Sequence, residues 1–290
     1  MKKLLLILMF VNFLNVYAQN PVQEFTFNGS LSSVDNTISF LGTPLFVNDR
    51  MGNPKSALRL NKAYQAVVGE LPQGNKPKTI SIWIKFNAVN TANYIFNYGT
   101  PANGQYFALI QQSVSGGNSD LSLVGWGDTN NIIVSVPLVK ETWYMYSVTY
   151  DGNVSKIYRN GELLKTVEGI QRSAKGYILS LGKLNTATSI NADIDDLRLY
   201  SVAMTDEQVF EAYKSSKPPV VAQATSTANL TKKTPPAAAK SPVPSADAKG
   251  GKNIEVFMDG KKIMDTNGTN ISDLAEGTYL IKVTNGTPKK

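Results

Sequence analysis

Three aspartates that lie close together, Asp193, Asp195 and Asp196, come nearest in this sequence to the types and spacing of a catalytic site. Two carboxylates can act as general acid and base in glycoside hydrolysis when both project into one cleft. Here the aspartates run directly into LRLY, and no ExDxxE-type strand places paired acids on one face. The sequence also has no histidine, which excludes a Ser-His-Asp triad and most zinc sites. We therefore predict that the protein is not an enzyme.

Aromatic side chains offer a second kind of chemistry, because flat rings can stack on sugar rings and line binding sites. Trp126 lies between two glycines in LVGWGD, near a turn, which suits an exposed platform. Tyr98 and Tyr106 flank the loop GTPANGQ. We predict that these three residues bind a ligand. The alternative is that each ring packs, half-buried, against a sheet.

The elements that must position these residues are strands. From residue 21 to about residue 215, short alternating runs are separated by Gly, Asn, Asp and Pro, a pattern typical of an all-β sandwich. In TISIWIKF, residues 79–86, four large apolar side chains share one face of a strand: Ile80, Ile82, Ile84 and Phe86. We expect this face to lie between two sheets.

A β-hairpin is indicated at Asn160-Gly161, a two-residue turn whose residues tolerate positive φ. The turn predicts three cross-strand pairs: Arg159 with Glu162, Tyr158 with Leu163, and Ile157 with Leu164. Because residues 151–153 turn the preceding strand WYMYSVTY back, three consecutive antiparallel strands follow. Further on, Thr205 and Gln208 form a capping box that predicts a short helix.

The composition changes after residue 216. Residues 217–252 contain six prolines and no aromatic residue, so they cannot bury enough apolar surface to fold, and we predict a disordered linker. Residues 253–290 hold three candidate strands, IEVFM, KKIMD and GTYLIKV, which predict a small β unit that is marginal alone. The main domain is therefore expected over residues 19–216.

The net charge of +7 does not indicate a nucleic-acid partner. The excess lies at Lys2 and Lys3 and in residues 217–252, which hold six lysines against one aspartate. Acidic and basic residues are equal in number in the remaining segments, so no phosphate-binding face is expected.

Residues 1–18 have the features of a signal peptide: a lysine-bearing start, an apolar run, and Val16 and Ala18 before an expected cleavage at Gln19. The run is too short to span a bilayer, and no later stretch approaches ~20 apolar residues. We expect a secreted or cell-surface protein with no transmembrane segment. The sequence has no cysteine, so a large core must supply the stability that disulfides give small secreted domains.

The sequence resembles the laminin G-like (concanavalin A-like) jelly-roll family in five phrases that follow the family's order. These are FTFNGS (25–30), DRMGNPKSALRL (49–60), TISIWIKF (79–86), the hairpin region (141–169) and ADIDDLRLYSVAMTDEQV (192–209). The resemblance implies an antiparallel jelly-roll β-sandwich. It also implies a non-catalytic binding module, as found in secreted adhesins, in matrix-like proteins and beside polysaccharide-degrading enzymes.

The same resemblance implies site and core residues. In related sandwiches, an aspartate at the position of Asp195 can bind Ca²⁺ together with an aspartate shortly after the opening FNG. Here that second position reads Ser32-Ser33, and Asp35 is the nearest carboxylate. The alternative is that the aspartates near residue 195 bond to a neighbouring loop. Trp83 and Trp143 match core positions of the family.

The C-terminal residues 253–290 resemble the second half of the sorting domain of the Bacteroidetes type IX secretion system, chiefly in FMDGKKIMD and ISDLAEGTYLIKVTNG. The resemblance implies recognition by secretion machinery. The alternative is a β appendage with no targeting role.

We therefore expect a secreted or cell-surface, non-catalytic module that recognises carbohydrate or a surface protein. Two alternatives remain: a structural domain that acts as an adhesion or matrix spacer without a specific ligand, and, more remotely, an enzyme of the glycoside hydrolase kind.

Overall fold

The computed structural model describes residues 20–219, 252–258, 261–266 and 280–285 of the 290-residue chain. The chain divides into two compact units, with the boundary between Gln223 and Ala224. The predicted signal peptide lies outside the described residues, as does most of the predicted linker. No helix in the described ranges has the length and apolarity needed to cross a membrane.

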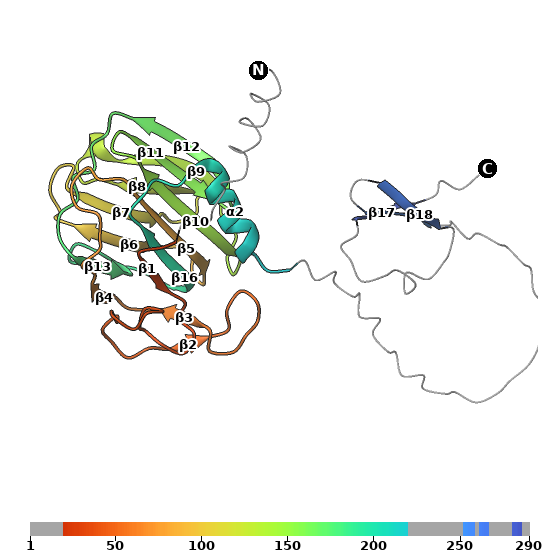
Figure 1. Ribbon diagram of the computed structural model, residues 1–290, viewed down its shortest axis with the longest axis horizontal. Coiled ribbons are helices and arrows are strands. Elements are labelled where there is room, and N and C mark those ends of the chain that lie inside the picture. The colour runs from red at the N-terminus through yellow and green to blue at the C-terminus, as the bar shows by residue number, and fades with distance from the viewer. Residues whose placement is uncertain (1–19, 220–251, 259–260, 267–279, 286–290) are drawn as a thin grey trace, which may run out of the picture. The chain divides into compact units, whose positions relative to one another are not determined.

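The first unit is a sandwich of two antiparallel sheets, which confirms the predicted fold class (Figure 1). The first sheet has the strand order β12-β11-β10-β5-β16-β3-β2, and β1 also pairs with β16. Its strands are β1 (Gln23–Phe25), β2 (Phe46–Val47), β3 (Ala57–Leu60), β5 (Lys78–Phe86), β10 (Trp143–Tyr150), β11 (Val154–Arg159), β12 (Glu162–Glu168) and β16 (Ala192–Tyr200).

The second sheet has the order β4-β13-β6-β7-β8-β9. Its strands are β4 (Tyr64–Val67), β6 (Asn93–Gly99), β7 (Tyr106–Gln111), β8 (Asn118–Val124), β9 (Ile132–Pro137) and β13 (Ile178–Leu181). A 3₁₀ turn, η2 (Asp128–Asn130), lies between β8 and β9. A small hairpin, β14 (Lys183–Leu184) with β15 (Ala187–Thr188), follows β13 and contacts β6.

The core lies between the two sheets, where the predicted aliphatic face of β5 is buried as expected: Ile80, Ile82, Ile84 and Phe86 are each at most 3% exposed. The second sheet contributes alternate residues of its strands, such as Phe107 and Leu109 of β7. The opposite face of β7 carries Tyr106 and Ala108, because successive side chains of a strand point to opposite faces. This large core is consistent with a fold that contains no cysteine.

The hairpin at Asn160-Gly161 forms with both turn residues at positive φ, 54° and 79°. The predicted pairs of Arg159 with Glu162 and Tyr158 with Leu163 are confirmed. The prediction for Ile157 is wrong, because the register shifts beyond Tyr158 and places Lys165 opposite it. A bulge of this kind adds an unpaired residue, which a turn motif alone does not indicate.

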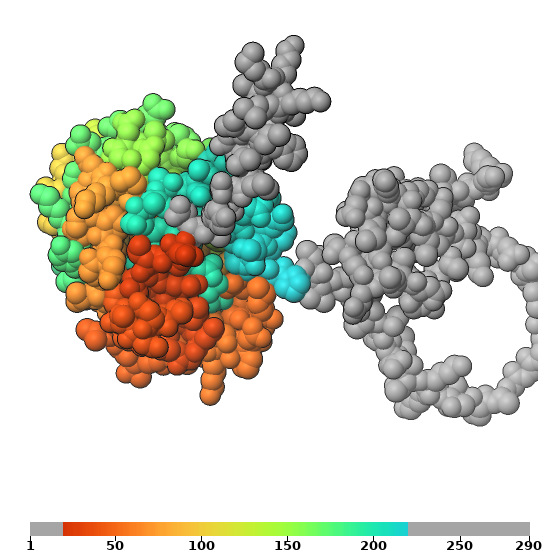
Figure 2. All heavy atoms as spheres, viewed as in Figure 1, coloured from red at the N-terminus to blue at the C-terminus, as the bar shows by residue number. Residues whose placement is uncertain are grey.

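Helix α2 (Asp206–Ser216) packs on the outer face of the first sheet. Its predicted capping box is present, with Thr205 and Gln208 satisfying each other's backbone N–H groups. Beneath the helix lies a second, smaller apolar cluster: Tyr158, Tyr200, Met204 and Val209. The helix therefore buries side chains that strand alternation alone would leave exposed. Figure 2 shows this side of the molecule, where residues near the N-terminus, in red, lie next to α2 in cyan.

The second unit contains a three-stranded antiparallel sheet with the order β18-β17-β19. Its strands are β17 (Lys252–Met258), β18 (Lys261–Thr266) and β19 (Leu280–Asn285), and they correspond to the three candidate strands of the sequence. Strand β17 begins at Lys252, the last residue of the predicted linker.

Candidate functional site

A polar pocket of about 440 Å³ opens among the loops at one end of the sandwich. This volume falls within the roughly 300–1,000 Å³ that small-molecule sites occupy. Four amide side chains dominate its lining, with one hydroxyl and one ammonium group. The lining residues are Gly74, Asn103, Gly104, Gln105, Asn130, Gln171, Ser173 and Lys175. We call it the Trp126 pocket, because the Trp126 carbonyl accepts hydrogen bonds from two lining residues, Gly104 and Asn130.

These two hydrogen bonds join the loop that contains Gly104 to the turn that contains Asn130. One comes from the Gly104 N–H at 3.1 Å and the other from Asn130 Nδ2 at 2.8 Å. Asn130 Nδ2 also donates to Asn103 Oδ1. Trp126 has a φ of +64°, and Gly127, which follows it, has a φ of +88°. A Cβ atom on Gly127 would lie 2.6 Å from Asn103 Oδ1, so the close approach of the two loops requires glycine there.

The three predicted aromatic ligand residues do not converge. Tyr98 is 1% exposed within the core, where its hydroxyl donates to the Pro72 carbonyl at 3.0 Å. Tyr106 is also 1% exposed, because hairpin β14–β15 covers it and Asn185 N–H donates to its hydroxyl at 3.0 Å. Burial raises the pKa of Tyr106. The prediction that these two tyrosines offer ring faces to a ligand is therefore wrong.

Trp126 is the member of the three that keeps solvent contact, since its side chain is half-buried. Its ring meets Tyr106 edge-on, with the centroids 5.4 Å apart and the planes at 69°. Tyr106 therefore supports Trp126 from the outer face of the second sheet and limits its rotation. The role of Trp126 in binding stays a prediction.

Two buried cations lie behind the walls of the pocket. Arg172 is fully buried between the lining residues Gln171 and Ser173, and its Nη1 donates to the Asn130 carbonyl at 2.9 Å. Lys78 is 1% exposed, and its Nζ donates to the carbonyls of Gly74 at 2.8 Å and of Arg172 at 3.2 Å. These two side chains thus hold three segments of the pocket by their backbone carbonyls.

The surroundings of Lys78 are aromatic. Its Nζ lies 5.9, 5.5 and 5.4 Å from the ring centroids of Tyr98, Phe107 and Tyr150, within the range of cation–π attraction. Burial, together with the nearby charge of Arg172, lowers the pKa of Lys78 to about 7. Burial likewise lowers the pKa of Arg172 to about 10. In the described part of the chain, no carboxylate pairs with either side chain.

Sequence reasoning did not identify the amides of this pocket or the two cations behind it. The phrase TPANGQ predicts only a loop between two strands, and GIQRSAKG, which supplies Gln171 to Lys175, carries no recognisable motif. Trp126 between two glycines is the sequence feature that lies next to this pocket, through the hydrogen bonds of its carbonyl. Asparagine and glutamine are common in surface loops, so their convergence becomes visible only in three dimensions.

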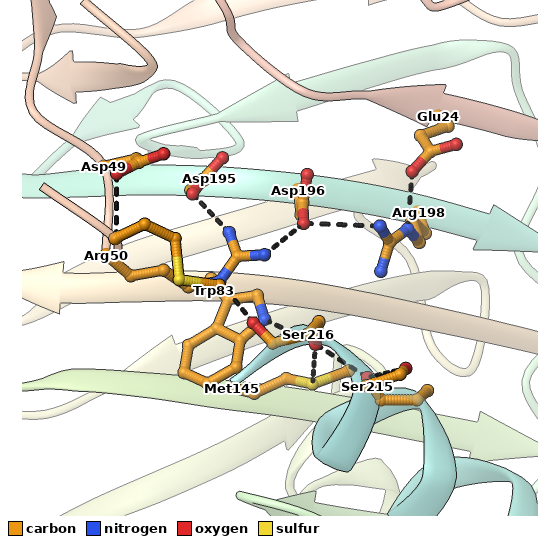
Figure 3. Close-up of polar contacts among 12 residues, drawn as sticks. Glu24, Asp49, Arg50, Trp83, Met145, Asp195, Asp196, Arg198, Ser215 and Ser216 are labelled. Carbon is orange, nitrogen blue, oxygen red and sulfur yellow. Dashed lines mark hydrogen bonds and ion pairs between the residues drawn. The ribbon is translucent and has the colours of Figure 1, made fainter. Parts of the chain in front are cut away.

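The proposed calcium ligands are engaged by protein groups. Arg50 pairs with Asp195, whose side chain is 3% exposed, and with Asp196 at 2.5 Å (Figure 3). Asp35 accepts hydrogen bonds from Ser33 Oγ at 2.5 Å and from the N–H and hydroxyl of Thr37. These donors lower the pKa of Asp35 to about 2. The guanidinium group of Arg50 lies where a cation would meet the Asp195 carboxylate, so the pair does not fit a shared Ca²⁺ site.

The family's expected core tryptophans lie outside the space between the sheets. Trp83 is 2% exposed because α2 covers it, with the centroids of Trp83 and Tyr213 5.7 Å apart. Trp143 is half-buried, with Lys85 Nζ 5.3 Å from its ring centroid. The expected core position of Trp143 is not confirmed, because its side chain is only half-buried and packs against Lys85 at the surface of the sheet.

Solved structures with this fold include binding domains. The chain is similar to domain 4 of AbnA, a GH43 extracellular arabinanase from Geobacillus stearothermophilus, in complex with arabinotriose. The identity is 19%, the TM-score is 0.55, and the match covers 67% of this chain and 98% of that domain. It is also similar to the botulinum neurotoxin serotype G binding domain, with 13% identity and a TM-score of 0.53. That match covers 68% of this chain and 51% of the toxin chain.

At these identities the structural likeness establishes the fold. A search of curated protein sequences finds no match to the chain. The family model of the concanavalin A-like lectin/glucanases superfamily matches residues 61–210, which is more than half of the chain. The matched segment runs from the loop before β4 into helix α2 and includes the whole Trp126 pocket. The chain therefore belongs to the concanavalin A-like lectin/glucanase superfamily.

Proposed function

We propose that the sandwich is a non-catalytic carbohydrate-binding module and that the Trp126 pocket is its ligand site. The observation that supports this most directly is the set of amides that meet there, from Asn103, Gln105, Asn130 and Gln171. Amide groups both donate and accept hydrogen bonds, as sugar hydroxyls require. Trp126, whose carbonyl bonds to the lining residues Gly104 and Asn130, has a half-buried ring, and we propose that this ring adds a flat apolar surface at the edge of the site.

Binding without catalysis is supported by the chemistry of the lining. None of the lining residues is acidic, so the pair of carboxylates that glycoside hydrolysis uses is missing from this pocket. The aspartates of β16 are already paired: Arg59 and Lys85 contact Asp193, and Arg50 contacts Asp195. A hydrolase of this fold would need acids free to exchange protons, and fold analogy alone does not supply them.

The proposal is tested by probing the full chain on a glycan array and measuring the affinity of hits by calorimetry. We expect specific glycan binding that Trp126→Ala and Gln171→Ala each weaken at least tenfold. Phe210→Ala is the matched control, because Phe210 is 46% exposed on helix α2, outside the pocket, and its loss should leave affinity unchanged. Circular dichroism establishes that each variant is folded.

A structural adhesion or matrix spacer without a specific ligand is the competing function. Binding to no glycan by a folded chain would overturn the carbohydrate proposal and favour the spacer. Binding that survives both pocket variants would place the ligand elsewhere on the molecule. A cell-surface protein as partner would be indicated if binding requires Trp126 but no glycan competes for it.

The proposed module acts outside the cell. Residues 1–18 have the signal-peptide features described above, and residues 253–290 resemble a type IX sorting domain. We propose that the C-terminal unit engages secretion machinery of the Bacteroidetes type and that the sandwich is its passenger. Ca²⁺ is not part of the proposed mechanism, because the pairing of Arg50 with Asp195 opposes it.

A further inference from the structure

We infer that the Trp126 pocket takes an acidic sugar, whose carboxylate or sulfate group supplies the counter-charge that Arg172 and Lys78 lack in the described part of the chain. The inference rests on the proposed function, since it specifies the ligand of the same pocket. It starts from an unusual feature: two cationic side chains are buried side by side with no carboxylate partner. Buried charges are ordinarily paired, because leaving water is costly for an ion.

The hydrogen bonds of Lys78 and Arg172 go to neutral oxygen atoms, so they occupy donor groups of the two side chains but do not neutralise their charge. Lys78 donates to two backbone carbonyls, and Arg172 donates to the Asn130 carbonyl and to Ser155 Oγ at 3.0 Å. Arg172 Nη2 is buried and has no hydrogen-bond partner among the described residues. Carbonyl and hydroxyl dipoles orient the cations but leave the local charge positive.

The pocket continues this positive region to the surface. Lys175 is exposed and is the charged member of the lining. Of the nearby acids, Asp128 lies in η2 and Asp151 lies beside the 74–76 loop, and both are exposed and screened by water. Charges beneath a protein surface are screened less than exposed ones. Arg172, with a pKa of about 10, and the protonated fraction of Lys78, with a pKa of about 7, therefore add to the positive potential that Lys175 gives the pocket.

An acidic sugar fits these features better than a neutral one. Its ring and hydroxyls would use Trp126 and the amides, and its anionic group would lie toward Lys175. Binding would then supply a negative charge near Arg172 and Lys78, which lowers the cost of keeping both buried and charged. A neutral sugar would make the same hydrogen bonds without this gain.

The test compares two matched probes on the full chain: oligogalacturonate and its methyl ester, which has the same length but no charge. We expect the free acid to bind at least tenfold more tightly, with an affinity that falls as salt rises. Lys175→Gln should remove most of this preference and Lys175→Arg should retain it. Lys165→Gln is the control, because Lys165 is exposed on β12 and does not line the pocket. Chondroitin sulfate with its desulfated form separates sulfate from carboxylate recognition.

The outcomes distinguish the two proposals. Equal binding of acid and ester, lost in Trp126→Ala, would overturn the acidic ligand and leave the carbohydrate function standing. Acid binding that is insensitive to both Trp126→Ala and Lys175→Gln would place the anion elsewhere and also overturn the inference. If neither these probes nor any array glycan binds the folded chain, both proposals fail.

Discussion

In the Trp126 pocket, the shape is set by one group of side chains and the charge by another. Asn130 Nδ2 donates both to the carbonyl of Trp126 and to Asn103 Oδ1, which fixes the loops, while Arg172 and Lys78 hold the pocket segments from the core side. A buried carboxylate would have neutralised the cations and could have fixed the loops equally well. Its absence from the described surroundings is what makes the pocket suited to an anionic ligand.

The titration of Lys78 gives a stability prediction. The pKa of Lys78 is lowered to about 7 by burial in the fold, against an ordinary value of 10.5 in the unfolded chain. Between these pH values the unfolded chain binds one more proton at this residue than the folded chain. The contribution of Lys78 to the free energy of unfolding therefore rises as pH increases from about 7 toward 10.5.

The measurement is urea unfolding of the wild type and of Lys78→Met between pH 6.5 and 9.5. We expect the difference in unfolding free energy, wild type minus variant, to increase with pH. The upper limit stays below the pKa of Arg172, which burial lowers to about 10, so only a minor fraction of Arg172 is deprotonated there, and Tyr150, whose pKa is raised by burial, stays protonated. Arg172 and Tyr150 are present in both proteins, so their contributions cancel in the difference of unfolding free energies. A difference that is flat or that falls with pH would show that Lys78 keeps its ordinary titration in the fold.

At the scale of elements, one arginine from the loop between β2 and β3 adds polar contacts to the apolar and aromatic packing that fixes helix α2 on the first sheet. Arg50 Nε donates to the carbonyl of Ser216 at 2.7 Å, while its other nitrogens meet Asp195 and Asp196 on β16 (Figure 3). The guanidinium carbon also lies 5.0 Å from the ring centroid of Trp83. One side chain thus joins a loop, a strand and the end of a helix.

Replacing Arg50 should therefore cost far more than losing a surface pair. In Arg50→Met, Asp195 takes up a proton near neutral pH, because burial and the charge of Asp196 already raise its pKa to about 7. The variant still loses the charge-assisted bonds of Arg50 to Asp195, Asp196 and the Ser216 carbonyl, and we expect a loss of about 2–4 kcal/mol in the free energy of unfolding. The matched comparison is Lys214→Met, which breaks an exposed pair with Glu211 at 3.4 Å and should cost about 0–1 kcal/mol. Urea midpoints measure both variants, and similar losses would contradict the assigned role of Arg50.

Sequence patterns predicted the positions of strands and turns better than the burial and pairing of individual side chains. Alternation placed Ile80 to Phe86 correctly, and Asn160-Gly161 fixed the hairpin turn, because both signals are local. The bulge beyond Tyr158 and the covering of Tyr106 by hairpin β14–β15 escaped prediction, since each depends on contacts between distant segments. The Arg50 ion pairs span about 145 residues of sequence for the same reason. The pocket, assembled from four separate loops, was the least predictable feature.

At the scale of the whole molecule, charge is distributed unevenly along the chain. The sandwich carries balanced charges overall, so its positive pocket is a local feature and not a consequence of net charge. The lysine excess lies instead between the sandwich and the C-terminal strands, in residues 217–252. We therefore propose specific binding for the first unit and export for the second.

The proposed export role predicts where a truncated chain accumulates. In a Bacteroidetes host with type IX machinery, the full chain should appear at the cell surface or in the medium. A chain that ends after Lys217 should remain in the periplasm, because it lacks strands β17 to β19 while retaining residues 1–18 and the sandwich. Fractionation and immunoblotting locate each form, and retained glycan binding shows that the truncated chain is folded. Equal export of both chains would assign the terminal strands a role other than sorting, because the passenger would then leave the cell without them.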